Sequence, residues 1–337
     1  MKIGNFDLNR NILLVAEIGN NHEGDFDCAK RLIREAAKAG ADAVKFQTIV
    51  PERLVAPQEK ERRKQLEKFC LRYDQFEQLS KVAHEENVLF LSTPFDIPSV
   101  HFLKPYVPAY KIASGDNDFF PLIKAIAQTG KPILLSSGLS TLEQIRKTKE
   151  FIETVWQQDK IQQEIAILHC VVSYPTEPKH ANLLAIRELS GLGVTVGYSD
   201  HTLGIEAAVL SVALGARVIE KHFTLSKTYS DFHDHKISAD PNDFLELSRR
   251  VRNANELLGD GVKQIQEPEL KNMGKVRRTI VAAQDLKEGA IIRWDNLSWL
   301  RPSAGLRPGE EEKVVGKKLK RALAAGDPIL PQDLVAL

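Results

Sequence analysis

Short apolar runs alternate with segments of helical periodicity over most of the chain. Eight of these runs are near-continuously apolar or β-branched, which predicts strands buried on both faces of a parallel sheet. They lie at residues 11–19, 42–46, 87–91, 110–113, 132–135, 165–169, 194–197 and 217–221. With helices between most of them, over roughly 250 residues, they predict a (β/α)8 TIM barrel. A doubly wound open sheet is the alternative.

Polar side chains follow the apolar part of each predicted strand. In a TIM barrel the residues at the carboxyl ends of the strands face the active site. The converging lysine, serine and threonine side chains predict a phosphate or carboxylate site, and the carboxylate and imidazole groups predict a metal site. The strand-end residues are Glu17, Asn21, Glu23, Lys45, Gln47, Ser92, Thr93, Asp96, Lys111, Ser114, Asp116, Ser136, Ser137, His169, Tyr174, Ser199, Asp200, His201, Lys221 and His222.

Two of these strand ends carry a histidine pair. The strands at 194–197 and 217–221 enclose a segment from Leu203 to the stop signal Gly215, which predicts one helix. A right-handed crossover then makes the strands parallel neighbours and brings His201 and His222 side by side. Two imidazoles on rigid strand ends form a candidate divalent-metal site. The alternative is two histidines that only form hydrogen bonds at the barrel rim.

The pattern changes after a last predicted helix at 241–258. A polar, glycine-containing stretch through Gly274 predicts a linker, and a compact module of about 60 residues follows, which is small for an independent core. The predicted organisation is a barrel domain at 1–260, a linker at 261–277 and a small, mostly β domain at 278–337. A faint internal repeat spans this module at a constant offset of 37 residues: Leu286, Gly289, Ile292 and Leu297 recur as Leu323, Gly326, Ile329 and Leu334.

The net charge limits the classes of partner. The chain has 46 Lys and Arg against 45 Asp and Glu, so no overall field favours nucleic acid or an anionic membrane. No apolar run reaches membrane-spanning length, and the N-terminal residues lack the apolar core of a signal peptide. Three cysteines without metal-type spacing fit free thiols in a reducing compartment. We therefore expect a cytoplasmic protein.

Eight segments at or near the strand ends form a recognisable set of motifs: AEIGNNHEG (16–24), KFQT (45–48), STPF (92–95), YKIASG (110–115), LHC (168–170), YPT (174–176), GYSDHT (197–202) and EKHFT (220–224). Together they resemble the sialic acid synthase family, which includes N-acetylneuraminate, legionaminate and pseudaminate synthases and spore-coat polysaccharide relatives. The likeness covers essentially the whole chain, since residues 278–337 resemble the antifreeze-like (SAF) domain of that family.

The resemblance implies a transferase that forms a carbon–carbon bond in surface polysaccharide or glycan biosynthesis. It would condense phosphoenolpyruvate with the open-chain aldehyde of an N-acetylmannosamine-type sugar and release phosphate. The same chemistry on a 2,4-diacetamido-trideoxyhexose is the alternative. A metal-free aldolase, in which Lys111 or Lys221 forms a Schiff base, is a rival of another mechanistic class. A non-catalytic sugar-binding or scaffold protein is the third reading.

The resemblance also assigns roles to individual residues. His201 and His222 would bind Mn²⁺ or Mg²⁺, and Glu23 would act on the water that adds to the former phosphoenolpyruvate. Arg301 matches an arginine that the small domain of one subunit would insert into the partner's barrel to bind the sugar, which implies a domain-swapped homodimer. The expected phosphoenolpyruvate-binding residues are Lys45, Thr93, Lys111, Ser114, Ser136 and Ser199, and the expected sugar-binding residues are Gln47, Tyr174 and Asp234.

Three positions depart from the family pattern. Phe232 and His233 precede Asp234 where glycine and proline are frequent, Val171 and Val172 stand where a threonine and a polar residue are common, and Asp116 replaces a frequent glutamate. All three departures fall where the sugar is expected. Because an unpaired polar group on a buried ligand is costly, the loss of hydrogen-bonding side chains favours a less hydroxylated or deoxy sugar.

Overall fold

The computed structural model describes residues 1–335 and contains two compact units, Met1–Gly259 and Asp260–Leu337. Each unit has its own hydrophobic core. We call the first the barrel unit and the second the small unit. No helix within residues 1–335 combines the length and the apolar character that crossing a membrane requires.

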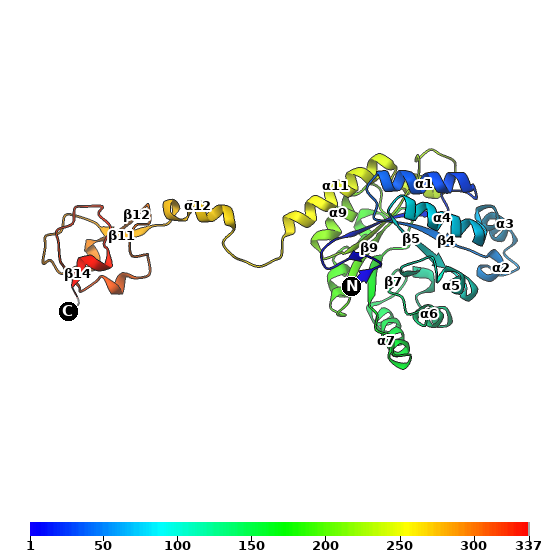
Figure 1. Cartoon of the computed structure of the whole chain (residues 1–337), viewed down its shortest axis with the longest axis horizontal. Helices are drawn as coiled ribbons and strands as arrows, with labels where there is room; N and C mark the ends of the chain where they lie inside the picture. Colours follow the sequence, from blue (N-terminus) through cyan, green and yellow to red (C-terminus); the bar gives the residue numbers. More distant parts are fainter. Residues whose placement is uncertain (336–337) are drawn as a thin grey trace. The chain divides into compact units, whose positions relative to one another are not determined.

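The barrel unit is built on a parallel sheet of eight strands, in which strands consecutive in the sequence lie side by side (Figure 1). The two end strands, β5 and β6, also contact each other, so the sheet closes on itself. The predicted TIM barrel is thereby confirmed, and the open-sheet alternative is wrong. The strands are β3 (Leu13–Gly19), β4 (Ala43–Thr48), β5 (Leu89–Pro94), β6 (Tyr110–Ile112), β7 (Ile133–Ser136), β8 (Ile165–Cys170), β9 (Thr195–Asp200) and β10 (Val218–His222).

Helices surround the sheet and cover its outer face. The segment between the two histidine-bearing strands is helical only from Glu206, and Leu203 lies outside the helix and is exposed. The helices are α1 (Phe26–Lys38), α2 (Pro51–Leu54), α3 (Lys60–Phe69), α4 (Tyr73–Glu85), α5 (Ile97–Leu103), α6 (Phe120–Ala127), α7 (Leu142–Gln158), α8 (Ala185–Ser190), α9 (Glu206–Ala213), α10 (His233–Ile237) and α11 (Pro241–Leu258), with 3₁₀ turns η1 (Ser114–Asp116) and η2 (Pro178–His180).

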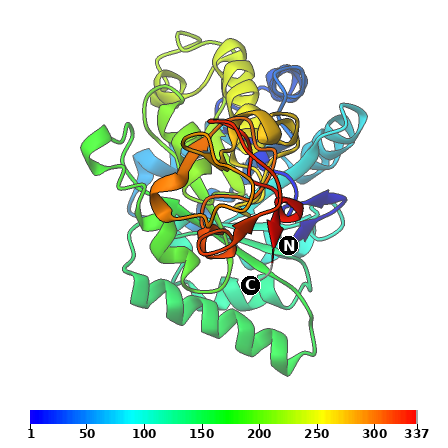
Figure 2. The ribbon, with the colours of Figure 1, turned by 90° about the vertical axis from the view of Figure 1, so that its left-hand side faces the viewer.

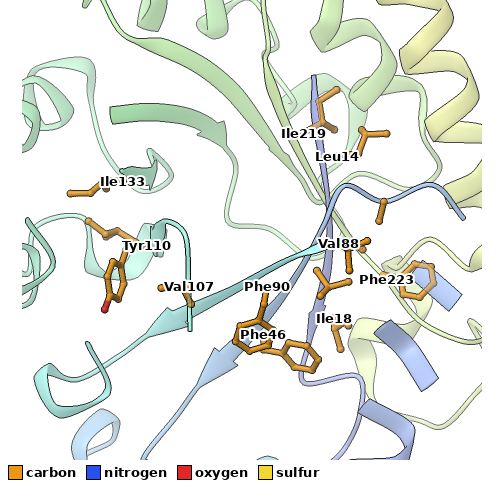
Figure 3. Close-up of a cluster of buried hydrophobic side chains, with 14 of the residues drawn as sticks. Leu14, Ile18, Phe46, Val88, Phe90, Val107, Tyr110, Ile133, Ile219 and Phe223 are labelled. Atoms are coloured by element: carbon orange, nitrogen blue, oxygen red, sulfur yellow. The ribbon is translucent and has the colours of Figure 1, made fainter. Parts of the chain in front are cut away.

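The main core lies between the sheet and these helices. Figure 3 shows part of it, where the rings of Phe46 and Phe90 pack with their centroids 5.8 Å apart. The apolar faces of the helices complete this core; α1, for example, buries Ala29, Leu32 and Ile33 against the strands. Burial of both strand faces explains why the strands read as continuous apolar runs in the sequence.

A second, smaller core fills the inside of the barrel at the amino ends of the strands. Here the N-terminal hairpin of β1 (Lys2–Ile3) and β2 (Phe6–Asp7), which the sequence analysis does not predict, contributes Met1, Ile3 and Leu8. These side chains close the end of the barrel opposite to the polar strand ends. The residues that the sheet contributes to this core, with Ala109 just before β6, are Leu13, Val15, Ala43, Leu91, Ala109, Leu134, Ala166, Leu168 and Val218.

Gly197 occupies the corresponding inward position on β9, and the space there is too small for a side chain. A Cβ atom at residue 197 would lie 2.5 Å from the carbonyl oxygen of Val218 and 3.0 Å from the side chain of Leu168. We therefore expect Gly197→Ala to lower the free energy of unfolding of the barrel unit by about 1–3 kcal/mol, as overpacking does. Urea denaturation measures this, with Gly115→Ala as the control because no atom lies within 4 Å of its added Cβ. Equal stability of the two variants would contradict the prediction.

From Thr279 onward the small unit is built of short strands and turns (Figure 2), which pack around its own core. Its strands are β11 (Thr279–Ala282), β12 (Leu297–Leu300), β13 (Lys318–Leu319) and β14 (Leu334–Val335), and its 3₁₀ turns are η3 (Trp294–Asn296), η4 (Glu311–Lys313) and η5 (Pro331–Asp333). The internal repeat is structural: η3 with β12 and η5 with β14 have the same form 37 residues apart. Leu286 and Leu323 form a β-bridge, and both repeated glycines have positive φ angles.

The segment expected to be a linker contains a helix, α12 (Glu267–Val276). A capping box between Gln266 and Glu269 and a proline in the first turn account for its start. None of its residues is buried. The sequence predicts a linker here because apolar residues are few, although the capping pattern is visible in it.

Candidate active site

The polar layer at the strand ends follows from the alternation of side chains along each strand. Residues two apart share a face, so each inward apolar residue is followed by a second inward residue at the carboxyl end. On all eight strands this second residue lines one pocket of about 210 Å³, which we call the floor pocket. The residues are Glu17, Lys45, Thr93, Lys111, Ser136, Cys170, Ser199 and Glu220.

Two lysines and two glutamates of this layer form a buried network of ion pairs. The Lys45 ammonium lies 2.8 Å from a carboxylate oxygen of Glu17 and 3.6 Å from one of Glu220. The Lys111 ammonium lies 3.8 Å from the other oxygen of Glu220. All four side chains are less than a tenth exposed. Because buried charges are costly unless paired, the network holds each charged group in a fixed place at the bottom of the pocket.

Hydroxyl groups surround the two ammonium groups. Lys111 donates a hydrogen bond to the Ser136 hydroxyl at 2.6 Å, and Lys45 donates one to Thr93 at 3.2 Å. Ser199 donates to Glu220 at 2.9 Å. Ammonium and hydroxyl donors that converge on one small pocket are suited to an anionic ligand with several oxygen atoms.

The two carboxylates differ in their ionisation. Burial opposes ionisation of Glu220, but the ammonium groups of Lys111 and Lys45 outweigh it and lower the pKa of Glu220 to about 2. Burial raises the pKa of Glu17, and Lys45 only partly offsets this. Burial lowers the pKa of Lys111, whereas for Lys45 the two glutamates outweigh burial and raise the pKa. The pocket thus keeps Glu220 ionised and disfavours the charged form of Glu17.

Glu220 is the one charged residue of the floor pocket that is absent from the strand-end residues predicted from the sequence. It lies inside the EKHFT motif, two positions after the apolar inward residue Val218, and the same alternation that places Lys45 after Ala43 would have placed it in the pocket. Glu17 appears among the strand-end residues of the sequence but received no role. Both carboxylates contact the lysines that were assigned to an anion.

His201 and His222 each follow an inward-facing residue by two positions, Ser199 and Glu220, and therefore face inward one level above that layer. His201 and His222 have ring centroids 5.5 Å apart, and both line the floor pocket. His201 Nδ1 lies 2.8 Å from the carbonyl oxygen of Val171. Since a carbonyl can only accept, Nδ1 of a neutral His201 carries the proton and Nε2 keeps its lone pair. Burial disfavours the charged form of His201, but Cys170 and Val171 outweigh burial and raise its pKa.

His222 has the features of an unsatisfied ligand. Its Nδ1 is buried and has no hydrogen-bond partner within residues 1–335. Burial, and then the neighbouring His201, lower its pKa well below the usual value, so its ring is neutral as metal ligation requires. No group of three or more His, Cys, Asp or Glu side chains suited to a metal occurs in the described part of the chain. A pair of neutral imidazoles on neighbouring strand ends could hold a divalent ion here.

A second pocket, also of about 210 Å³, adjoins the floor pocket, and we call it the rim pocket. The two pockets share Gln47, Tyr174 and His222. The Tyr174 ring packs against His201 with centroids 4.2 Å apart. The rim pocket is lined by Asn20, Gln47, Arg62, Leu66, Phe69, Tyr174, His222, Phe232, His233 and Asp234. All three side chains expected to bind the sugar thus line one pocket.

Glu23 does not line either of these pockets. It lies in the loop between β3 and α1, where its Oε1 accepts hydrogen bonds from the Ser230 hydroxyl at 2.6 Å and from His235 Nε2 at 2.9 Å. The other ring nitrogen of His235 lies 2.7 Å from the Thr224 hydroxyl. The carboxylate is therefore tied to the segment that carries Asp234, and its Oε2 is left for another partner.

The remaining predicted residues fall in different places. Ser114 lines the floor pocket and accepts a hydrogen bond from the Gly138 amide at 3.1 Å. Val172 lines the same pocket, whereas Asp116 lies in η1. Arg301 belongs to the small unit and is exposed.

Lys221, one of the two lysines considered for a Schiff base, is fully buried beside Asp200. Its ammonium lies 2.8 Å from the Asp200 carboxylate and also donates to the Thr202 carbonyl. It does not line the floor or the rim pocket. An amino group that is enclosed and bound to a carboxylate away from both pockets is unsuited to act as a nucleophile. Of the two lysines considered for a Schiff base, Lys111 is the one that faces the floor pocket.

Comparison with known proteins gives the same picture of the chain. It is 41% identical over 326 residues to an uncharacterized protein of Methanocaldococcus jannaschii, covering 96% of this chain and 94% of that protein. It is 38% identical over 320 residues to the N,N'-diacetyllegionaminic acid synthase of Campylobacter jejuni, covering 90% and 95%. A crystal structure of the N-acetylneuraminic acid synthetase from Leptospira borgpetersenii matches with a TM-score of 0.75 and 35% identity, covering 81% and 94%.

The family models agree with these relatives. Residues 32–263 match the NeuB family and residues 277–335 match the SAF domain. The resemblance to sialic acid synthases and to the antifreeze-like domain is thereby confirmed. The named relatives are synthases, so the chain is an enzyme of this class and the scaffold reading is wrong. The protein belongs to the NeuB family and ends in an SAF domain.

Proposed function

We propose that this protein condenses phosphoenolpyruvate with the open-chain aldehyde of a 2-acetamido sugar and releases phosphate. The observation that carries the proposal is the pair of adjoining pockets. One contains two lysines among hydroxyl donors, and the other is lined by mixed polar and aromatic residues. They meet at Gln47, Tyr174 and His222. An anionic substrate and a neutral sugar could therefore occupy separate pockets with their reacting carbons at the shared boundary.

The floor pocket is the proposed site of phosphoenolpyruvate. Its phosphate and carboxylate need several donors, and Lys45, Lys111 and the hydroxyls of Thr93, Ser114, Ser136 and Ser199 are available there. Charge-assisted hydrogen bonds are strong in a buried site of low dielectric constant. Glu17 and Glu220 keep both ammonium groups in place before the substrate arrives, which preorganises the pocket.

His201 and His222 are the proposed ligands of a divalent ion, Mn²⁺ or Mg²⁺. The buried, unpartnered Nδ1 of His222 and the free lone pair of His201 fit this role. When bound, such an ion supplies Lewis-acid polarisation of the aldehyde oxygen.

The proposed reaction runs through two bond-forming steps. The C3 carbon of phosphoenolpyruvate attacks the aldehyde carbon, and a water molecule then adds to the cationic C2 carbon. The resulting tetrahedral intermediate expels phosphate. Glu23 is the proposed general base that takes a proton from the water, as the resemblance implies. Ser230 and His235 both bind its Oε1, so Oε2 is the oxygen that would receive the proton.

The proposed assembly is a domain-swapped homodimer, in which Arg301 of the partner subunit enters the barrel. The exposure of Arg301 in the small unit supports this arrangement, since its guanidinium is available to another subunit. A guanidinium can bind several oxygen atoms of a sugar through its planar set of donors.

The test is phosphate release from phosphoenolpyruvate by EDTA-treated protein, with and without added Mn²⁺. We expect release only with both Mn²⁺ and an amino-sugar acceptor, and mass spectrometry should find a product three carbons longer than that acceptor. The acceptors are N-acetylmannosamine, its 6-phosphate and a 2,4-diacetamido-trideoxyhexose. Borohydride treatment with substrates should trap no imine on Lys111. Release without metal, or a trapped imine, would favour the Schiff-base alternative instead.

A further inference from the structure

The backbone of Glu23 has a conformation that residues with a side chain rarely adopt. Its φ angle is 49°, in the left-handed region. The next residue, Gly24, packs so closely on α3 that an added Cβ atom would lie 2.1 Å from the Lys68 carbonyl oxygen. The Gly24 amide also donates a hydrogen bond to His22 Nδ1 at 3.0 Å. The surrounding structure thus holds this loop in a costly conformation, and such conformations cluster at active sites.

The side chain of Glu23 is held by a buried histidine. Its Oε1 accepts hydrogen bonds from the Ser230 hydroxyl and, at 2.9 Å, from His235 Nε2. His235 has no exposed surface, and its Nδ1 lies 2.7 Å from the Thr224 hydroxyl. Both ring nitrogens therefore have protein partners. His235 cannot itself act on a water molecule in either pocket.

The two neighbours of the His235 ring determine where its proton lies. A general base must be ionised, and an ionised carboxylate only accepts, so Nε2 carries the proton that it donates to Glu23. In a neutral ring Nδ1 is then an acceptor, and the Thr224 hydroxyl is its donor. That hydroxyl also lies 3.1 Å from the Ser226 carbonyl oxygen, but its 2.7 Å contact with the ring is shorter. Thr224 thereby fixes the tautomer of His235.

The hydrogen bonds that start at Glu23 do not form a path for protons. They run through His235 to Thr224, and the next oxygen within reach is the Ser226 carbonyl. A carbonyl oxygen accepts a hydrogen bond but does not take up a proton under these conditions. A proton that reaches Glu23 from water therefore cannot be passed on through the ring. The arrangement is suited to holding the carboxylate in place.

Helix α10 also ties the carboxylate to the rim pocket. Asp234, the residue before His235, lines that pocket. The Ser238 hydroxyl at the end of α10 donates to the Asp234 carbonyl and accepts a hydrogen bond at 2.9 Å from the buried side chain of Asn21. Asn21 and Glu23 belong to the same loop. The loop and the helix are therefore bonded at two points, which fixes the carboxylate relative to the pocket wall.

We propose that His235, with its tautomer fixed by Thr224, is the positioning residue for Glu23. The inference rests on the proposed function, in which Glu23 takes a proton from the attacking water. The ring binds Oε1 and prevents the carboxylate from turning, so Oε2 stays available to the water. A catalytic group that is misplaced by about 1 Å can lose about 10²-fold in rate. The effect falls on kcat, because His235 lines neither substrate pocket.

The first measurement compares His235→Gln with His235→Phe in steady-state phosphate release. Glutamine keeps an N–H group that can donate to Glu23, whereas phenylalanine keeps the ring shape and loses both hydrogen bonds. We expect kcat to fall about 10²-fold in His235→Phe and less than about tenfold in His235→Gln, with both KM values within about twofold of wild type. An equal fall in the two variants, or a raised KM with unchanged kcat, would overturn the inference.

The same hydrogen bonds stabilise the barrel unit, so lost stability needs its own control. Trp156→Phe is matched, because the buried indole of Trp156 donates a hydrogen bond to the Ala127 carbonyl at 3.1 Å and lines neither pocket. It should lower the free energy of unfolding and leave kcat unchanged. If it lowers kcat as much as His235→Phe does, lost stability explains both effects and the positioning role is wrong.

A double-variant cycle tests whether His235 acts through Glu23. In a Glu23→Gln background, His235→Phe should cause little further fall in kcat, since the group that it positions is already absent. An undiminished fall of about 10²-fold in that background would show that His235 acts by another route.

Thr224→Val tests the tautomer with a side chain of nearly the same shape. It should lower kcat about tenfold, and Thr224→Ser should restore it, because serine keeps the hydroxyl. Thr224 is two residues from His222, so Mn²⁺ affinity must be measured and should be unchanged. Wild-type kcat in Thr224→Val would overturn the role of Thr224.

Absence of turnover with every acceptor would overturn the proposed function, and crystal structures of the variants would then test the inference without a substrate. The Glu23 carboxylate should keep its hydrogen bond to Ser230 in His235→Gln and shift by about 1 Å or more in His235→Phe. A carboxylate that does not move in His235→Phe overturns the positioning role.

Discussion

Lys111→Met should lower kcat/KM for phosphoenolpyruvate by about 10²–10³-fold. Lys111 faces the floor pocket, and its ammonium is the nearest cation to Ser136 and one of two that neutralise Glu220. The variant removes a donor to the substrate and also leaves a buried carboxylate with one ion-pair partner fewer. Breaking one partner of a buried ion pair costs about 3–5 kcal/mol, and part of this cost falls on substrate binding. The chemistry with the bound acceptor should change less than the affinity for phosphoenolpyruvate.

Steady-state phosphate release at varied phosphoenolpyruvate concentration measures this effect. Lys38→Met is the control, because Lys38 is a 68% exposed lysine on α1 that forms only a surface ion pair with Glu35. Thermal unfolding should show whether the Lys111 variant remains folded. The contrary result is a folded variant with wild-type kcat/KM for phosphoenolpyruvate and a raised KM for the acceptor. In that case the floor pocket binds the acceptor and the rim pocket binds phosphoenolpyruvate.

The barrel is predictable from the sequence because strands buried on both faces appear in it as near-continuous apolar runs. Strands such as Leu13–Gly19 are apolar at every position except Glu17, so their positions are visible without any structure. The residues at which the strands end are harder to predict, because polar residues end the apolar run before the strand itself ends. β9 is expected to stop at residue 197 but extends to Asp200, so Ser199 lies within the strand and not after it.

The floor of the site is also predictable, because it repeats the same alternation on every strand. Glu220 is nonetheless missed, because the prediction has Lys221 and His222 as the polar end of that strand and does not apply the alternation from Val218. The contact between the rings of Phe69 and Phe232 cannot be predicted in this way. It depends on how α3 and the segment before α10 meet, and no periodicity in either segment specifies that contact. Arg62 lies in a run of charged residues at 59–64, and nothing in that run marks Arg62 as the residue that lines the rim pocket.

His222→Phe should abolish metal-dependent phosphate release while leaving the barrel unit as stable as the wild type, or more stable. His222 Nδ1 is buried without a partner in the described residues, and such a polar group costs about 1–3 kcal/mol. A phenylalanine ring has no polar atom to satisfy, so the cost disappears. Loss of the ligand should reduce the rate at least about 10³-fold, because Lewis-acid activation contributes several kcal/mol. Mn²⁺ titration followed by electron paramagnetic resonance should show weakened binding.

His235→Phe is the matched control for this variant, since His235 is equally buried but bonded at both ring nitrogens. Phenylalanine there removes one hydrogen-bond partner from Glu23 and one from Thr224, and we expect a loss of about 1–3 kcal/mol in the free energy of unfolding. The comparison separates the two kinds of buried histidine. A histidine retained for the fold stabilises the protein, whereas one retained for a ligand destabilises it until the ligand binds. If His222→Phe is the more destabilised of the two, the ring at 222 has a structural role and the metal site must be sought elsewhere.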